Sequence, residues 1–327
     1  MAAVALDARK VDVRYLEQPC KTALNRVKGM PFNWSLNPYM GCEHRCAFCY
    51  VRFFELRADR PFDDRYGRAV RVKTNVAEVL RSELARRSWK RESVAVGAAT
   101  DPYQPAEGTY RLTRACLEAF ADFATPVGLI TRGPMIVRDV DVLIRLARSA
   151  VLTVNFSIPT LDDDIWRRTE PGTAHPRQRL RAIERLAAAG IKVGVGMAPI
   201  LPGLSDRPEL LEEVVRAARD AGATSIWANL LYLREGTRDH FLEVLGRHWP
   251  ELLPRYQAEY RGTGYLPKEK MEPVQRQVRE MARRLQIGAG PKRHLSPAES
   301  PADSYAPRPK PQAAEPEPPQ QLSLIVD

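Results

Sequence analysis

Short apolar runs alternate with amphipathic segments along the first 235 residues of the chain. The runs are partly β-branched and are bounded by Gly, Pro or Asp, a pattern that is typical of buried parallel strands. We therefore expect six strands, at Ser35–Met40, Ser93–Ala99, Val127–Thr131, Val151–Ile158, Lys192–Met197 and Ser225–Leu230.

The segments between these runs carry apolar residues at helical spacing. Leu180, Ile183 and Leu186, for example, share one face of a helix that ends at Gly190. Strands that alternate with helices predict a parallel sheet with right-handed crossovers. Periodicity alone does not choose between a doubly wound sheet and a partial barrel. We expect helices at Asn75–Arg87, Tyr110–Phe123, Asp139–Arg148, Pro176–Ala189 and Pro208–Ala221.

The organisation of the chain changes at three points. Residues 1–34 form an N-terminal extension, residues 35–235 the alternating α/β region, and residues 236–287 a mostly helical C-terminal region. From residue 288 to 327 the chain is crowded with proline, so it cannot bury enough apolar surface to offset the entropy cost of ordering. We expect this last segment to be a disordered tail.

The composition, 44% apolar and 28% charged, is that of an ordinary globular protein. No apolar stretch reaches the ~18–20 residues that a membrane helix needs, and Met1–Val13 lacks a secretory pattern. Five cysteines, three of them clustered, do not suggest a secreted disulfide framework. We therefore expect a cytoplasmic protein with no membrane partner.

The net charge of the chain is +10, and its basic excess lies before Leu285, because the residues from there on carry more acidic than basic side chains. A basic fold suggests a polyanionic partner such as nucleic acid, held by salt-sensitive phosphate contacts. A basic surface also arises without such a function, so both interpretations stay open.

Three cysteines in one loop directly follow the first expected strand. Cys42, Cys46 and Cys49 are spaced by four and three residues, so their thiols can converge on one inorganic centre. A structural zinc ion needs four ligands, and neither His44 nor Cys20 stands at a usual zinc spacing to complete the set. An iron–sulfur cluster held by three thiolates leaves one iron open, which can chelate the amino and carboxylate groups of S-adenosylmethionine (SAM).

The Cys-x3-Cys-x2-Cys pattern, with Phe48 before the last cysteine, resembles the signature of the radical SAM superfamily. The resemblance covers roughly residues 20–235 and implies a partial (β/α)6 barrel of the TIM type. It also implies a [4Fe–4S] cluster on Cys42, Cys46 and Cys49, bound SAM with Phe48 near its adenine, and an electron donor such as flavodoxin or ferredoxin. Ligands would bind at the carboxyl ends of the strands.

Five further segments are similar to the spore photoproduct lyase-like branch, whose members resemble DNA repair photolyases. Each segment lies at the carboxyl end of an expected strand, which places all of them on the same face of the barrel. The segments are Ser35–Cys42, Thr100–Glu107, Arg138–Asp141, Glu170–Pro171 and Pro199–Gly203.

One position departs from that branch. Spore photoproduct lyases carry a hydrogen-donating cysteine just ahead of the threonine at the end of strand two, whereas Ala98 and Ala99 precede Thr100 here. This departure counts against the same repair reaction by the same route. Tyr103 and Tyr232, which lie near strand ends, are alternative candidates for the hydrogen donor.

Several polar residues near strand ends are candidate SAM ligands. Thr100 and Asp101 could accept hydrogen bonds from the SAM amino group or ribose, and Arg168 suits the SAM carboxylate. Asn155 and Ser157 point to one face of a buried strand, where polar groups are costly unless they are satisfied. Structural hydrogen bonds for this pair, and an exposed helix position for Arg168, remain the alternatives.

The segment Gln321–Ile325 near the C-terminus resembles the short motif by which bacterial repair and replication proteins bind the sliding clamp. Gln321 could bind the rim of the clamp pocket, while apolar residues fill its groove. A nonspecific terminus and a self-docking segment are the alternatives.

Three functional hypotheses therefore follow from the sequence. The first is a radical SAM enzyme that acts on nucleic acid, in the manner of a DNA-repair lyase. The second is a radical SAM enzyme that modifies a protein or a small molecule. The third is a non-enzymatic zinc-binding protein.

Overall fold

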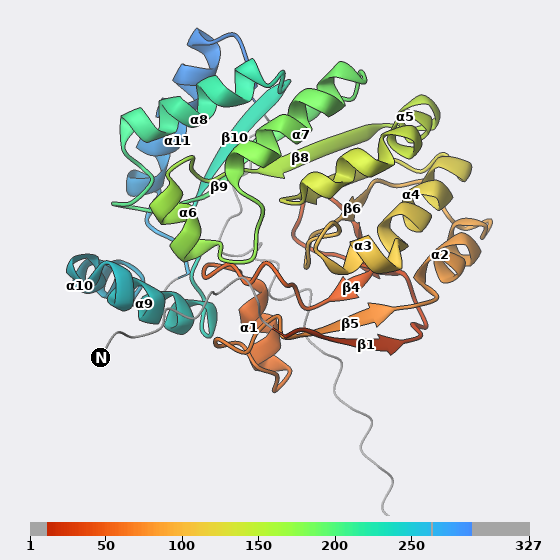
Figure 1. The fold of residues 1–327 in the computed structure, drawn as a ribbon, viewed down its shortest axis with the longest axis horizontal. Coiled ribbons are helices and arrows are strands. Elements are labelled where there is room, and N and C mark those ends of the chain that lie inside the picture. The colour runs from red at the N-terminus through yellow and green to blue at the C-terminus, as the bar shows by residue number, and fades with distance from the viewer. Residues whose placement is uncertain (1–11, 263, 290–327) are drawn as a thin grey trace, which may run out of the picture.

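The computed structural model describes residues 12–262 and 264–289, and its core is an eight-stranded sheet. The six central strands of this sheet run parallel to one another and lie side by side in chain order (Figure 1). This order is that of a partial (β/α)6 barrel, so the expected fold is confirmed. The six strands are β3 (Trp34–Leu36), β6 (Val94–Val96), β7 (Val127–Thr131), β8 (Leu152–Ser157), β9 (Val193–Ile200) and β10 (Ser225–Leu230).

The first expected strand, Ser35–Met40, is wrong as a single element. The chain leaves the barrel after β3, because Pro38 cannot donate to a strand ladder and the Asn37 side chain accepts a hydrogen bond from Ala99 N at 2.9 Å. The following β4 (Tyr39–Met40) joins a second, three-stranded sheet in the order β1-β5-β4. Its other strands are β1 (Arg14–Gln18) and β5 (Ala69–Lys73).

Two short strands flank the six parallel ones. The strand β2 (Leu24–Arg26) pairs antiparallel to β3, and β11 (Gly288–Ala289) pairs parallel to β10. Gly288 and Ala289, which were expected to begin the tail, belong to β11. Gly288 allows this close pairing with β10 because it has no side chain: a Cβ at Gly288 would lie 2.6 Å from Thr224 O.

The five expected helices are present within a few residues of their predicted bounds and surround the sheet (Figure 1). They bury one apolar face each against the strands, so that strand and helix side chains form one continuous core. These helices are α2 (Val76–Leu84), α4 (Leu112–Asp122), α5 (Val140–Ser149), α7 (Pro176–Ala188) and α8 (Pro208–Asp220).

Shorter helical segments lie in the loops that follow the carboxyl ends of the strands. Their placement brings loop residues over the face at which we expect ligands to bind. They are α1 (Val51–Arg57), α3 (Ala106–Tyr110), the 3-10 helix η1 (Pro134–Asp139) and α6 (Asp163–Thr169).

The C-terminal region is helical, and its last helix covers the last long strand of the barrel. The helix α11 (Lys268–Arg284) packs against β10 and α8, and Gln275 Nε2 donates to Ala228 O at 3.4 Å. Before it come α9 (Thr237–His248), the 3-10 helix η2 (Pro250–Leu252) and α10 (Leu253–Glu259), with α9 in contact with α1 and α6.

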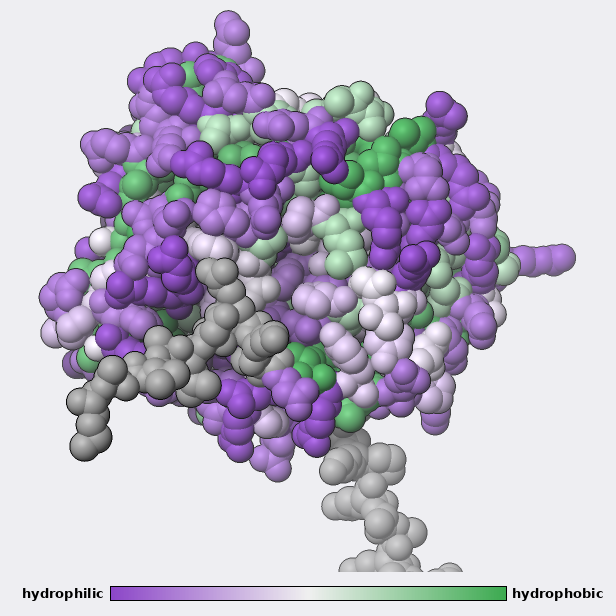
Figure 2. All heavy atoms as spheres, viewed as in Figure 1, coloured by the Kyte–Doolittle hydropathy of each residue, from purple (hydrophilic) through white to green (hydrophobic). Residues whose placement is uncertain are grey.

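The surface seen in Figure 2 is predominantly hydrophilic, with separate hydrophobic patches. Among the helices of the described residues, none combines the length and the apolar character needed to cross a membrane. The proline-rich segment from residue 290 onward and its clamp-like motif Gln321–Ile325 lie outside the described residues.

Candidate active site

The cysteine loop between β4 and α1 brings three thiols to one pocket. Cys42 and Cys46 are buried and Cys49 is partly exposed, and all three line this pocket together with the ends of β6 and β7. Gly41 makes the entry to the loop possible, because it has a φ of +90° and a Cβ there would lie 2.7 Å from Ala69 O. The predicted convergence of the cysteines is therefore present.

The donor set of the pocket bears on which centre the thiols can hold. Three cysteines line the pocket, and the nearby His44 faces Asp101, with 3.4 Å between Nδ1 and Oδ2. A structural zinc ion needs four ligands, whereas three thiolates suit an iron–sulfur cluster with one open iron. The donor set therefore fits an iron–sulfur cluster.

Burial controls the protonation of Cys42 and Cys46. It raises the pKa of Cys46 to about 12, and together with the charges of Asp101 and Cys49 it raises the pKa of Cys42 well above its usual range. Thiols of this kind stay protonated at neutral pH unless a cationic centre displaces the proton. Loading a cluster would therefore release protons from the loop.

Residues at the end of β6 brace the backbone of the cysteine loop. The Thr100 hydroxyl donates to Gly41 O at 2.9 Å and accepts from Gln104 Nε2 at 2.9 Å. Gln104 Nε2 also donates to Gly41 O, and its Oε1 accepts from Glu43 N at 3.0 Å. Thr100 lines the pocket as predicted, but its hydroxyl is engaged in holding the loop.

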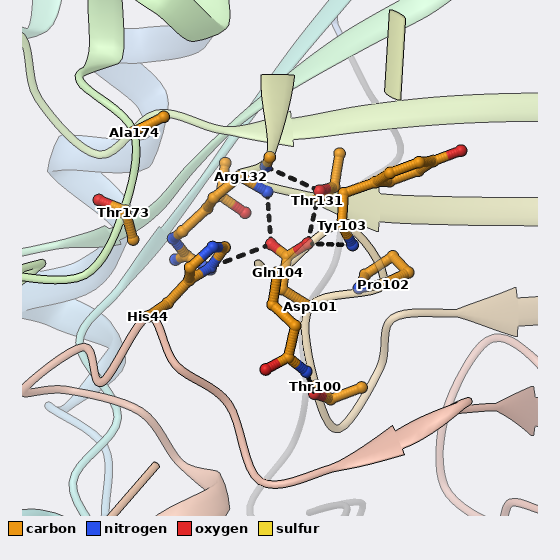
Figure 3. A network of polar contacts seen from close by, with 12 residues as sticks. His44, Thr100, Asp101, Pro102, Tyr103, Gln104, Thr131, Arg132, Thr173 and Ala174 are labelled. Atoms are coloured by element: carbon orange, nitrogen blue, oxygen red, sulfur yellow. Dashed lines mark hydrogen bonds and ion pairs between the residues drawn. The ribbon is translucent and has the colours of Figure 1, made fainter. Parts of the chain in front are cut away.

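Asp101 joins three separate segments at the pocket wall (Figure 3). Its Oδ1 accepts from Thr131 Oγ1 at 2.7 Å and from Tyr103 N at 2.8 Å. Its Oδ2 accepts from Arg132 N at 2.6 Å and lies 3.4 Å from His44 Nδ1. Burial alone would raise the pKa of Asp101, but His44, the Thr131 hydroxyl and the Arg132 N–H outweigh it and lower the pKa to about 2.

Arg132 is a pocket residue that the sequence analysis did not select. Its guanidinium carbon lies 5.7 Å from the centroid of the buried Phe48 ring, its Nε lies 3.3 Å from Glu170 Oε1, and its Nη2 donates to Ala198 O at 3.2 Å. The side chain keeps 20% of its surface exposed, so the guanidinium remains accessible from the pocket. Its position directly after the expected strand Val127–Thr131 was the available signal.

Glu170, the partner of Arg132, also forms a buried ion pair. Glu170 also contacts Arg179, whose side chain is fully buried and donates to Ser157 O at 2.8 Å. Burial alone would raise the pKa of Glu170, but the charges of Arg179 and Arg132 outweigh it and lower that pKa. Glu170 belongs to one of the segments singled out in the sequence, whereas Arg179 gave no signal beyond its helical position.

The remaining predicted ligands, Asn155, Ser157 and Arg168, are not among the residues that line the cysteine pocket. Ser157 is buried at the end of β8, and half-buried Asn155 accepts from Trp227 Nε1 at 3.4 Å. Arg168 is not brought to the pocket. It lies on α6, where its Nε donates to Asp164 Oδ1 at 2.8 Å and its guanidinium carbon lies 5.4 Å from the Trp249 ring centroid.

The two tyrosines considered as hydrogen donors are both engaged elsewhere. Tyr103 is buried and its hydroxyl donates to Asp139 Oδ2 at 3.1 Å. Tyr232 packs against Tyr265, with ring centroids 4.2 Å apart. Neither is among the residues that line the cysteine pocket.

Comparisons with known proteins agree with this geometry. The family model of the radical SAM superfamily matches residues 36–214. An uncharacterized protein of Mycobacterium tuberculosis is 37% identical over 292 residues, which cover 87% of this chain and 84% of that protein. A radical SAM Nalpha-GlyT isomerase of Pseudomonas phage M6 is 28% identical over 171 residues, 51% of this chain and 33% of that protein.

The fold is also similar to that of solved structures. Spore photoproduct lyase with bound AdoMet and dinucleoside spore photoproduct matches with a TM-score of 0.63 and 17% identity. The match covers 84% of this chain and 80% of the lyase. At this identity the likeness concerns the fold.

Proposed function

The chain belongs to the radical SAM superfamily, and we propose that within it the chain is an enzyme that acts on a nucleic acid substrate. Cys42, Cys46 and Cys49 would hold the [4Fe–4S] cluster that the superfamily implies, next to bound SAM. When bound, the cluster supplies the electron that cleaves SAM to a 5′-deoxyadenosyl radical, which starts the superfamily's chemistry.

The observation that carries the radical SAM chemistry of this proposal is the pocket shared by the three thiols and the carboxyl ends of β6 and β7. Asp101 accepts hydrogen bonds from Thr131 Oγ1 and Arg132 N, which joins the ends of β6 and β7 before any ligand enters. Arg132 presents a guanidinium that suits the carboxylate of SAM, and Phe48 presents an aromatic ring beside it. Cys42 and Cys46 are buried, which would limit the access of water to a cluster bound there.

Two features support nucleic acid as the substrate. The chain carries a net charge of +10, which favours a polyanion. The structurally similar spore photoproduct lyase binds a dinucleoside, and the likeness spans most of both chains.

The residues that line the pocket favour a reaction that differs from that of the lyase. Ala98 and Ala99 line the pocket where the lyase branch carries its hydrogen-donating cysteine. Among the described residues, Cys42, Cys46 and Cys49 are the only cysteines of the pocket lining. We therefore propose nucleic acid chemistry in which no pocket thiol of the described chain returns a hydrogen atom to the product.

The test is the release of 5′-deoxyadenosine by the anaerobically reconstituted enzyme with and without DNA or RNA oligonucleotides. The proposal expects oligonucleotides to stimulate release, and added salt to suppress the stimulation, because phosphate contacts are salt-dependent. Heparin, a polyanion without bases, is the control and should not stimulate. Release that is indifferent to nucleic acid, with no binding at low salt, would instead favour a protein or small-molecule substrate.

A further inference from the structure

A loop outside the residues discussed so far covers the cysteine loop. This covering loop, residues 61–68, connects α1 to β5. Gly67 lies against the backbone of Cys42: it has a φ of +78°, and a Cβ there would lie 2.3 Å from Cys42 O. The absence of a side chain at Gly67 therefore lets the two loops touch.

A buried arginine fastens the covering loop to the cysteine loop. The side chain of Arg52 is almost fully buried and donates to carbonyl groups of both loops. Its Nε donates to Cys46 O at 3.3 Å and its Nη2 to Arg45 O at 3.2 Å. Its Nη1 donates to Asp63 O at 2.7 Å and also to Phe62 O.

This arrangement holds Tyr66 over the third cysteine. Tyr66 is 2% exposed, and the guanidinium carbon of Arg52 lies 4.7 Å from its ring centroid. The Tyr66 hydroxyl lies 3.7 Å from Cys49 Sγ, within the range of a hydrogen bond that involves sulfur. A ligating thiolate can only accept, so the phenol is the donor when Cys49 binds iron.

We propose that Tyr66 tunes the reduction potential of the cluster by donating a hydrogen bond to Cys49 Sγ. The proposal rests on the cluster ligation given under the proposed function. A donor to a ligand sulfur withdraws charge from the cluster and favours its reduced, more negative state. Tyr66 thus acts through Cys49 and raises the potential, with Arg52 and Gly67 fixing its position.

The first test is the Tyr66→Phe variant, which keeps the ring and removes the donor. The midpoint potential of the reconstituted holoenzyme is measured by redox titration, with the reduced cluster followed by electron paramagnetic resonance. We expect a more negative potential, with the equilibrium constant for reduction lower by on the order of tenfold, or about 59 mV for one electron. The matched control is Tyr256→Phe, which removes a buried hydroxyl that donates to Pro202 O, outside the cysteine pocket. Its potential should equal that of the wild type.

The second test replaces Tyr66 with 3-fluorotyrosine, which keeps the ring and the hydroxyl but is a stronger donor. It should shift the potential in the opposite direction, to more positive values. If Tyr66→Phe fails to load a cluster, this variant still tests whether the Tyr66 hydroxyl affects the reduction potential. An unchanged potential with fluorotyrosine at full cluster content overturns the role of Tyr66. A wild-type protein that binds no iron and sulfide would instead overturn the proposed function itself.

Discussion

Asp101 Oδ2 accepts a hydrogen bond from the backbone N–H of Arg132 at 2.6 Å, which ties the carboxyl end of β6 to that of β7. The same carboxylate binds the Thr131 hydroxyl and approaches His44 of the cysteine loop. One buried side chain therefore sets the distance between the cysteines and Arg132, the two parts of the pocket that would meet the cluster and SAM.

Replacement of Asp101 by Asn should destabilise the protein. In the Asn side chain an NH2 group replaces one carboxylate oxygen, so it would face hydrogen-bond donors instead of accepting from them. The negative charge that His44 and the Arg132 N–H stabilise is also lost. Together these changes should lower the free energy of unfolding by on the order of 2–4 kcal/mol. Urea unfolding measures this change. Asp220→Asn, at an exposed position, is the control and should change it by less than about 0.5 kcal/mol. Equal changes in the free energy of unfolding of the two variants would contradict the structural role assigned to Asp101.

The stabilisation by Asp101 should also depend on pH. Its pKa of about 2 lies below the ~3.9 of an unfolded chain, so the ionised form stabilises the folded protein. That stabilisation is complete above about pH 4 and is lost as the pH falls toward 2. The difference in unfolding free energy between wild type and Asp101→Asn should therefore shrink from pH 5 to pH 2. A difference that stays constant would contradict the low pKa.

Arg132 and Arg168 give a direct comparison of two arginines. Arg132 lines the pocket, whereas Arg168 lies on α6 and packs against Trp249. Loss of a charged hydrogen bond costs roughly 1.5–3 kcal/mol, so Arg132→Gln should weaken SAM binding about 10- to 100-fold. Arg168→Gln should leave SAM affinity unchanged. Calorimetric titration of both variants with SAM checks this, and the reverse order would restore Arg168 as the SAM ligand.

Two glycines with the same φ test the contact between the covering loop and the cysteine loop. Gly67 and Gly190 both have a φ of +78°, but a Cβ at Gly67 would strike Cys42 O, whereas a Cβ at Gly190 meets nothing within 4 Å. Gly190→Ala should cost about 1 kcal/mol from backbone strain alone. Gly67→Ala should cost clearly more and should lower the iron bound per chain. Similar unfolding free energies and iron contents in both variants would show that the two loops do not touch closely.

The sequence was sufficient to predict the elements whose signal is local. The six parallel strands, the helices between them and the clustered cysteines each carry a periodic or spaced pattern within a few residues. The sheet of β1, β4 and β5 carries none, because its strands are two to five residues long and lack a clear alternation. Pro38 was the local clue that the first expected strand ends early.

The site residues show where local signals stop. Thr100 and Asp101 were found because they follow a strand, but their partners Gly41 and Thr131 lie far away in the sequence. Whether an arginine points into the pocket depends on the rotation of its segment relative to the barrel. For this reason Arg168 could not be separated from Arg132 without the packing of α6 against α9.

The central claim is that three cysteines of one loop hold a cluster that cleaves SAM. The most direct test measures iron, acid-labile sulfide and zinc after anaerobic reconstitution, followed by 5′-deoxyadenosine release under strong reductant. The account predicts about four iron and four sulfide per chain, as a [4Fe–4S] cluster requires, with release of 5′-deoxyadenosine that is lost in Cys46→Ala. One zinc per chain, with no sulfide and no 5′-deoxyadenosine, would contradict it.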